Sequence, residues 1–117
     1  MSFEGNLNEL RDEVYKDAYD HGLYDGEYDA PQLEYAAPGL MFRIQEEVRE
    51  AWNAALDWMH GVLNAKDHVA EELADIIITA LSVAGHLGID IDAALRSKVA
   101  YNRTRPHKHK EEKKDVK

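Results

Sequence analysis

Cysteine is absent from this chain of 117 residues, which excludes disulfide bonds, thiolate catalysis and zinc sites built on cysteine. Long apolar runs are absent too. The longest, residues 76–87, contains three polar side chains and is too short to span a bilayer. Residues 1–10 have no basic segment followed by an apolar one, so we expect no signal peptide there. These absences favour a cytoplasmic protein that does not bind membranes.

Basic residues are scarce outside the C-terminal end of the chain. The formal net charge is -9. Residues 36–95 carry ten acidic and three basic residues, whereas residues 96–117 carry nine basic and three acidic ones. An acidic body repels the phosphate backbone of nucleic acids, so we expect no nucleic-acid partner. The basic end is either a solvated tail or, in its first part, a place to receive phosphate.

The sequence contains no internal repeat and no convincing strand pattern. Apolar residues instead recur at intervals of three and four, which is typical of amphipathic helices. We expect one all-α domain over residues 1–106, with helices at roughly residues 6–20, 39–59, 67–87 and 90–105. The remaining residues, 107–117, have almost nothing to bury and are expected to form a disordered basic tail.

Aspartate and proline residues mark several of the expected helix ends. Asp67 and Asp90 are expected to be the N-caps of the third and fourth helices. Pro31 and Pro38 exclude a continuous helix ahead of the second one, so residues 22–39 are expected to form a long loop. A loop of that length in a small domain is often a lid or a binding segment.

The third expected helix, which Gly88 ends, is apolar around most of its circumference. Such a pattern is typical of a nearly buried element. One thin layer of helices from so short a chain cannot cover all these faces. Because an exposed apolar patch marks an interface, we expect a homodimer or a homotetramer.

Two groups of carboxylates lie at helical spacing. Glu47 and Glu50 share a face of the second helix, and Glu72 and Asp75 share a face of the third. If these helices pack antiparallel, four carboxylates converge, and a hard cation such as Mg²⁺ would neutralise them. The alternative is two solvated acidic faces with scattered salt bridges. The position of Glu72 and Asp75 inside the most apolar helix weakens that alternative.

Basic and amide side chains gather on the fourth expected helix. Lys98, Asn102 and Arg105 share a face, and Arg103 lies beside them. Lysine and arginine bind phosphate oxygens, arginine often with two hydrogen bonds. A basic last turn that merely complements the helix dipole is the simpler interpretation. Beside a magnesium site, the binding of polyphosphate by these side chains becomes the better interpretation.

Other residues give weaker indications. Trp52 and Trp58 flank the end of the first acidic helix, where a nucleobase can stack on them, although packing in a core or an interface is the simpler interpretation. His60, His68 and His86 show no pattern typical of metal ligands. We find neither a Ser–His–Asp arrangement nor a glycine-rich phosphate loop.

The acidic residues resemble the signature of the MazG-like, all-α nucleoside triphosphate pyrophosphohydrolases, which is Glu-Glu-x-x-Glu, a spacer, and then Glu-x-x-Asp. Here the two parts are residues 46–50 and 72–75, separated by 21 residues. Residues 87–90 and 98–106 are also similar to that family. The resemblance covers roughly residues 40–106.

The resemblance implies a MazG-like helical bundle of two or four chains that uses Mg²⁺, with Mn²⁺ as a substitute, to release pyrophosphate from a nucleoside triphosphate. Glu46 or Glu50 would orient or deprotonate the attacking water. The implied metal ligands are Glu47, Glu50, Glu72 and Asp75, and the implied phosphate-binding residues are Lys98, Asn102, Arg103 and Arg105.

Several substrates and one different class of function stay open at this point. Relatives of the same architecture act on dUTP, dCTP or phosphoribosyl-ATP, and the sequence does not select among these substrates. Because the match is generic, we prefer a house-cleaning role in the nucleotide pool. The alternative from another class is a non-catalytic helical interaction protein that retains the fold.

Overall fold

The described part of the protein is all-α, as expected. The computed structural model describes residues 5–25 and 33–106, and no strand occurs within them. The helices follow one another as α1 (Leu7–Asp20), α2 (Leu33–Met59), α3 (Ala65–His86) and α4 (Ile91–Thr104). The tail expected at residues 107–117 lies outside the described residues, and so do residues 26–32 of the expected loop.

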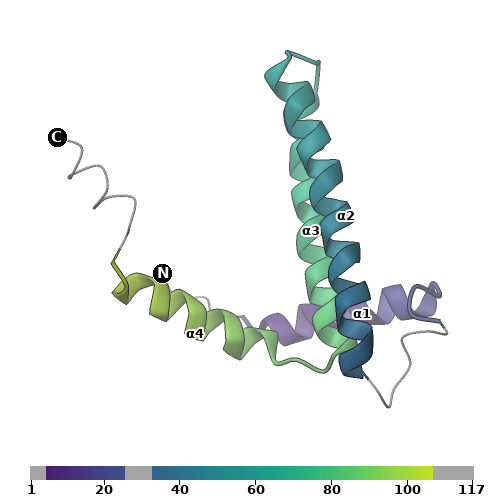
Figure 1. Cartoon of the computed structure of the whole chain (residues 1–117), viewed down its shortest axis with the longest axis vertical. Helices are drawn as coiled ribbons and strands as arrows, with labels where there is room; N and C mark the ends of the chain where they lie inside the picture. The colour runs from purple at the N-terminus through teal and green to yellow at the C-terminus, as the bar shows by residue number, and fades with distance from the viewer. Residues whose placement is uncertain (1–4, 26–32, 107–117) are drawn as a thin grey trace.

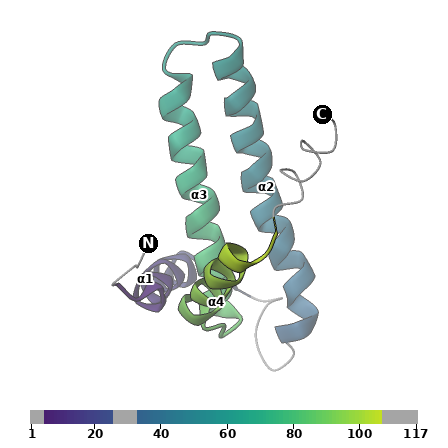
Figure 2. The same cartoon turned by 90° about the vertical axis from the view of Figure 1, so that its left-hand side faces the viewer.

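Helices α2 and α3 form a long antiparallel hairpin, which stands upright in Figure 1. Helices α1 and α4 lie across its lower end (Figures 1 and 2). α1 packs against α3 and also contacts α4. The antiparallel pairing of α2 with α3 brings the two acidic groups of the sequence to the same height on the hairpin.

Helix α2 begins at Leu33 and contains Pro38, so the prediction of a loop over residues 22–39 is wrong for the last part of that range. Proline lacks the N–H that the helix ladder needs, and this costs stability inside a helix. Here Pro38 is exposed and near the helix start, where it removes a single bond. Burial of Ala36 and Leu40 holds the same turns against the core. Tertiary packing therefore outweighs the local cost of the proline.

Helix α3 begins at Ala65, which corrects the prediction that Asp67 is its N-cap. Asn64 occupies the N-cap position in a left-handed conformation, with φ of 63°, and its side chain makes no capping hydrogen bond. Ala65 is buried, and it follows directly on the turn that connects α2 to α3. Asp67 lies in the first turn, where its charge still favours the helix dipole.

The connection from α3 to α4 agrees with the prediction. Gly88 has φ of 68° and follows the end of α3. The Ile89 N–H donates to the Ala84 carbonyl at 2.9 Å, the long bond of a Schellman motif. Asp90 then caps α4, because its side chain accepts a hydrogen bond from the Ala93 N–H at 3.0 Å. A residue with a side chain would be strained at position 88.

The main buried cluster lies at the lower end of the hairpin, where α1, α2 and α3 meet. Tyr24, Leu40 and Val83 are its largest fully buried side chains. α1 approaches α3 closely beside this cluster: a Cβ atom at Gly85 would lie 2.7 Å from the Cβ of Tyr15. Only glycine allows that approach, so Gly85 sets how α1 docks on α3.

Most of α3 is not buried within one chain, as expected for a helix with more apolar faces than so short a chain can cover. Its buried residues concentrate from Leu81 onward. Leu73 and Ile77, halfway along the helix, are 52% and 58% exposed. These apolar residues do not make a membrane helix: none of the helices in the described residues has the length and hydropathy to cross a bilayer. The exposed face is the kind of surface that marks an interface.

Candidate functional site

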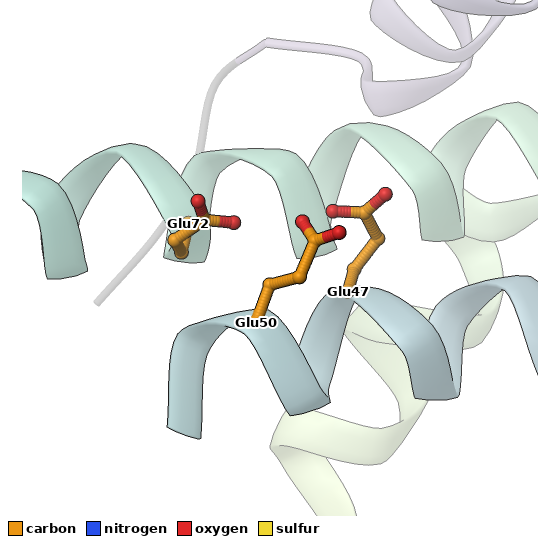
Figure 3. Close-up of side chains that lie close together, drawn as sticks. All are labelled: Glu47, Glu50 and Glu72. Atoms are coloured by element: carbon orange, nitrogen blue, oxygen red, sulfur yellow. The ribbon is translucent and has the colours of Figure 1, made fainter. Parts of the chain in front are cut away.

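Three carboxylates meet between α2 and α3. Glu47 and Glu50 project from one face of α2, and Glu72 projects from the facing side of α3 (Figure 3). Each offers one carboxylate oxygen, and these oxygens all lie within 4.8 Å of one another. The arrangement follows from a spacing of three residues on α2 and from the antiparallel packing of the hairpin. Oxygens at this separation suit a single hard cation.

Glu72 is the most constrained of the three acids. Its side chain is only 12% exposed. One carboxylate oxygen, Oε1, accepts a hydrogen bond from the His68 Nε2 at 3.0 Å. The other, Oε2, is buried and has no hydrogen-bond partner among the described residues. A buried carboxylate oxygen without a partner is costly, so this atom requires a cation or a water.

The charged form of Glu47 is destabilised by burial and by the neighbouring acids. Its pKa is raised above the ordinary value for a glutamate, first by burial and then by the negative charges of Glu50 and Asp75. The charge of Glu72 acts in the same direction. These carboxylates therefore repel one another, and a bound cation would relieve the repulsion.

Two further acids of the motif border the cluster without joining the group of three. Asp75, one turn after Glu72 on α3, is exposed and lies close enough for its charge to affect Glu47. Glu46 is exposed beside Glu47 and lines two neighbouring pockets. The structure thus brings three of the four predicted metal ligands together and places the fourth at their edge.

A pocket of about 410 Å³ opens directly beside the carboxylates, between α1, α2 and α3. Glu46 and Glu47 belong to both the pocket wall and the acidic surface. The remaining wall residues are Val14, Ala18, Leu23, Tyr24, Arg43, Ile78, Thr79 and Ser82. Its volume is in the range of small-molecule sites.

Tyr24 and Arg43 in this pocket wall contact each other. The Tyr24 hydroxyl and the Ser82 Oγ share a hydrogen bond of 2.6 Å, and the Tyr24 ring stacks on His86 with centroids 4.4 Å apart. The Arg43 guanidinium lies 5.0 Å from the centre of the Tyr24 ring and donates to the Leu23 carbonyl. The segment after α1 is thereby fixed against α2 and α3.

The sequence interpretation missed several of these residues. His68 had no recognised role, yet it orients Glu72. Arg43, Thr79 and Ser82 were not singled out as site residues. A signal for two of them was present, because Thr79 and Ser82 continue the spacing of Glu72 along an otherwise apolar helix.

Neither of the predicted tryptophans lines the pocket beside the carboxylates. Trp52 is 68% exposed and lines a groove of about 380 Å³ on α2, together with Phe42, Gln45, Glu46, Val48 and Arg49. Trp58 lies two helical turns beyond Glu50, and the Lys66 ammonium sits 5.7 Å from the centre of its ring. The groove at Trp52 shares Glu46 with the acidic motif.

Within one chain, the predicted phosphate-binding residues do not meet the carboxylates. Lys98, Asn102, Arg103 and Arg105 are all exposed, in the second half of α4 and its C-cap. That half extends away from the α2–α3 hairpin in Figure 1, and in Figure 2 α4 is seen nearly end-on, in front of the hairpin. The cations of Lys98 and Arg105 lie instead over the Tyr101 ring, at 5.1 and 5.9 Å from its centre.

Comparisons with known proteins give a family and a similar protein. The model of the family described as MazG-like matches residues 43–116, a range that contains both acidic motifs and α4. A dATP/dGTP diphosphohydrolase from Cyanophage S-2L is 47% identical over 67 residues, which cover 57% of this chain. The matched region spans 54% of that relative, about half of its length. No solved structure matches this chain.

Proposed function

This chain belongs to the MazG-like family, and from that premise we propose that it is a magnesium-dependent nucleoside triphosphate pyrophosphohydrolase. It cleaves an NTP or a dNTP to the nucleoside monophosphate and pyrophosphate. Its role is the removal of unwanted nucleotides from the pool. The name of the cyanophage relative specifies dATP and dGTP, so these two deoxynucleotides are the first substrates to test.

The observation that carries the proposal is the unpartnered Oε2 atom of Glu72 beside Glu47 and Glu50. The donor set is made of carboxylate oxygens, which fits Mg²⁺ and also Mn²⁺. Asp75, whose charge acts on Glu47, is the proposed fourth carboxylate. When bound, the metal supplies positive charge that neutralises the carboxylates and the phosphates of the substrate.

The residues of the chain then position the reactants. Hydrolysis adds water to the α-phosphorus, and the bond from that phosphorus to the bridging oxygen breaks, so that pyrophosphate leaves. Glu46, exposed at the edge of the carboxylate cluster, accepts the proton that the attacking water loses. Glu50, on the same face of α2 as Glu46, is the second candidate for this base. Positioning and charge neutralisation supply most of the catalysis in phosphoryl transfer.

A second copy of the chain completes the proposed site. Lys98, Asn102, Arg103 and Arg105 hold the phosphates, and α4, which carries them, extends away from the hairpin of its own chain (Figure 1). The exposed apolar residues Leu73 and Ile77 offer the surface on which chains associate. The proposed assembly is a homodimer or a homotetramer whose basic α4 residues reach the acids of a neighbouring chain.

The decisive experiment measures pyrophosphate release from a panel of nucleoside triphosphates with Mg²⁺, and again with a chelator. The panel includes dATP, dGTP, dUTP and dCTP, together with phosphoribosyl-ATP. Glu72→Gln is expected to lose activity, whereas Glu71→Gln, an exposed neighbour with the same charge change, is expected to keep it. Orthophosphate as the first product, or no product from any nucleotide, would contradict the proposal and favour a non-catalytic interaction protein.

A further inference from the structure

One face of α3 carries a line of polar residues that extends beyond the carboxylate motif. Its members are spaced alternately by four and three residues, so they share a face. They are His68, Glu72, Asp75, Thr79, Ser82 and His86. Four of them are buried or half-buried, whereas the apolar Leu73 and Ile77 on the opposite face are exposed. Seam positions of a helix hairpin are ordinarily apolar, so this polar line requires a reason.

The pocket beside the carboxylates supplies that reason. Glu72 lies at the acidic end of the line, and Thr79 and Ser82 line the pocket from α3 together with Ile78. From Glu72 to Ser82 the helix rises by about 15 Å. That length accommodates a ligand with a phosphate chain at one end and a flat organic group at the other. Glu47 belongs to both the carboxylate cluster and the pocket, so the two are continuous.

The far end of the pocket offers neutral hydrogen-bonding groups. The Tyr24 hydroxyl and the Ser82 Oγ share one hydrogen bond at 2.6 Å, which uses one of their two hydroxyl hydrogens. Burial raises the pKa of Tyr24, so this hydroxyl stays protonated near neutral pH. The pair therefore keeps one hydrogen to donate. The Thr79 hydroxyl, one turn of α3 away, can both donate and accept.

Apolar side chains line the other parts of this partly open pocket. Val14 and Ala18 come from α1, Leu23 from the segment after it, and Ile78 from α3. Apolar walls with a few convergent polar groups are typical of sites for a planar organic ligand. The walls suit the faces of a nucleobase, and the hydroxyls suit its hydrogen-bonding edge.

We propose that this pocket holds the base of the substrate nucleotide, with Thr79 and Ser82 as the residues that bind its polar edge. The inference rests on the proposed function and adds the orientation of the substrate to it. The base lies toward α1, and the phosphates lie toward Glu47 and Glu72. Thr79 and Ser82 are then specificity-determining residues of the reaction.

The groove at Trp52 is the competing position for the base. All six of its lining residues come from α2, so one helix surface forms it. Residues from three helices and from the segment after α1 line the proposed pocket. A site built from several elements removes more of a bound base from water. The proposed pocket also shares Glu47 with the carboxylate cluster, whereas the groove shares only Glu46 with the acidic motif.

Steady-state kinetics of hydroxyl variants test the proposal. Thr79→Val and Ser82→Ala are expected to raise KM for the best nucleotide by about tenfold each, the effect of one lost hydrogen bond. kcat and the affinity for Mn²⁺ should change little, because the carboxylates are untouched. Ser97→Ala, which removes an exposed hydroxyl from α4, is the matched control with an unchanged KM.

A structural role for Ser82 gives a different result. Tyr24→Phe removes the same Tyr24–Ser82 bond but keeps the serine hydroxyl. If Ser82 only supports Tyr24, Ser82→Ala and Tyr24→Phe lower the thermal stability equally and leave KM unchanged. That outcome, with an unchanged KM for Thr79→Val, overturns the inference while leaving the proposed function intact.

A binding experiment separates the inference from catalysis. Amide chemical shifts are recorded while a deoxynucleoside monophosphate is titrated into the full chain. Changes centred on Ala18, Thr79 and Ser82 support the pocket, even if no nucleotide is hydrolysed and the proposed function fails. Changes centred on Trp52, or no changes at any residue, overturn the inference.

Discussion

Asn8 and Asp92 cap each other's helices. The Asp92 Oδ1 accepts a hydrogen bond from the Leu7 N–H of α1 at 2.9 Å. In return, the Asn8 Oδ1 accepts from the N–H groups of Ile91 and Asp92 in α4, at 3.1 and 3.3 Å. Each side chain satisfies N–H groups that a helix start leaves without partners. The exchange fixes the direction of α4, and with it the position of the basic residues.

This contact predicts a loss of stability in acid. The Arg96 guanidinium and the Leu7 N–H hold the pKa of Asp92 below its ordinary value of 3.8. A carboxyl whose pKa is lower in the folded state stabilises the fold above its unfolded pKa, and the contribution is lost as pH falls through the folded value. Thermal unfolding followed by circular dichroism should therefore show a falling Tm below about pH 4.

Asp92→Asn should have a lower Tm than the wild type at pH 7 and a weaker dependence on pH in that acidic range. Asp57→Asn, an exposed change on α2, is the control. The pKa of Asp90 is also lowered, by the Ala93 N–H and by Asn8, so this carboxyl likewise stabilises the fold less as the pH falls. Some acid sensitivity should therefore remain in the variant. Identical pH profiles for Asp92→Asn and the wild type would contradict the capping role.

Glu47→Gln should make the metal-free protein more stable and the enzyme much less active. The substitution removes a partly buried charge that Glu50 and Asp75 repel. We expect Tm in the presence of a chelator to rise by a few degrees. Hydrolysis should fall by about 100-fold or more, since even residues that only support a metal ligand contribute about 10- to 100-fold. A fall in Tm together with full activity would refute this account.

His68 should tune the metal affinity through Glu72. The His68 Nε2 holds one oxygen of that carboxylate and so orients the other. We expect His68→Ala to weaken Mn²⁺ binding by about tenfold, with partial rescue in His68→Gln. Calorimetric titration measures the affinity. The control is His60→Gln, because His60 contacts the Leu56 carbonyl and no acid of the cluster. Equal affinities in all variants would remove His68 from the site.

The chain should be an oligomer whose association requires the apolar face of α3. Ile77→Glu places a charge on that face and should give a monomer of about the chain mass, 13.3 kDa. Light scattering at micromolar concentration distinguishes the states. A wild-type mass that stays monomeric on concentration would reject the assembly.

Mixing inactive variants tests whether chains share sites. Glu50→Gln damages the carboxylate cluster, and Arg103→Ala damages the phosphate grip. The two variants are unfolded and refolded together, so that mixed assemblies form. In some of their sites, the intact carboxylate cluster of an Arg103→Ala chain faces the intact α4 of a Glu50→Gln chain. We expect part of the activity to return. No recovery, despite proven mixed oligomers, would place both sets of residues in one chain.

Local spacing was sufficient to predict much of this protein. Intervals of three and four residues identified the helices and placed Glu47 and Glu50 on one face. Gly88 and Asp90 marked the end of α3 and the start of α4, where both make the expected backbone interactions. These features depend on residues within one or two helical turns of each other, so the linear pattern already contains their physical cause.

Contacts between distant residues decided the rest. α2 extends through Pro38 because Leu40 is buried against side chains from elsewhere in the chain. The direction of α4 follows from Asn8 and Asp92, which are more than 80 residues apart in the sequence. The pocket at Thr79 exists because α1 docks on α3 at Gly85. A local pattern cannot predict such features, since their energy comes from burial and hydrogen bonds that form only when separate helices pack together.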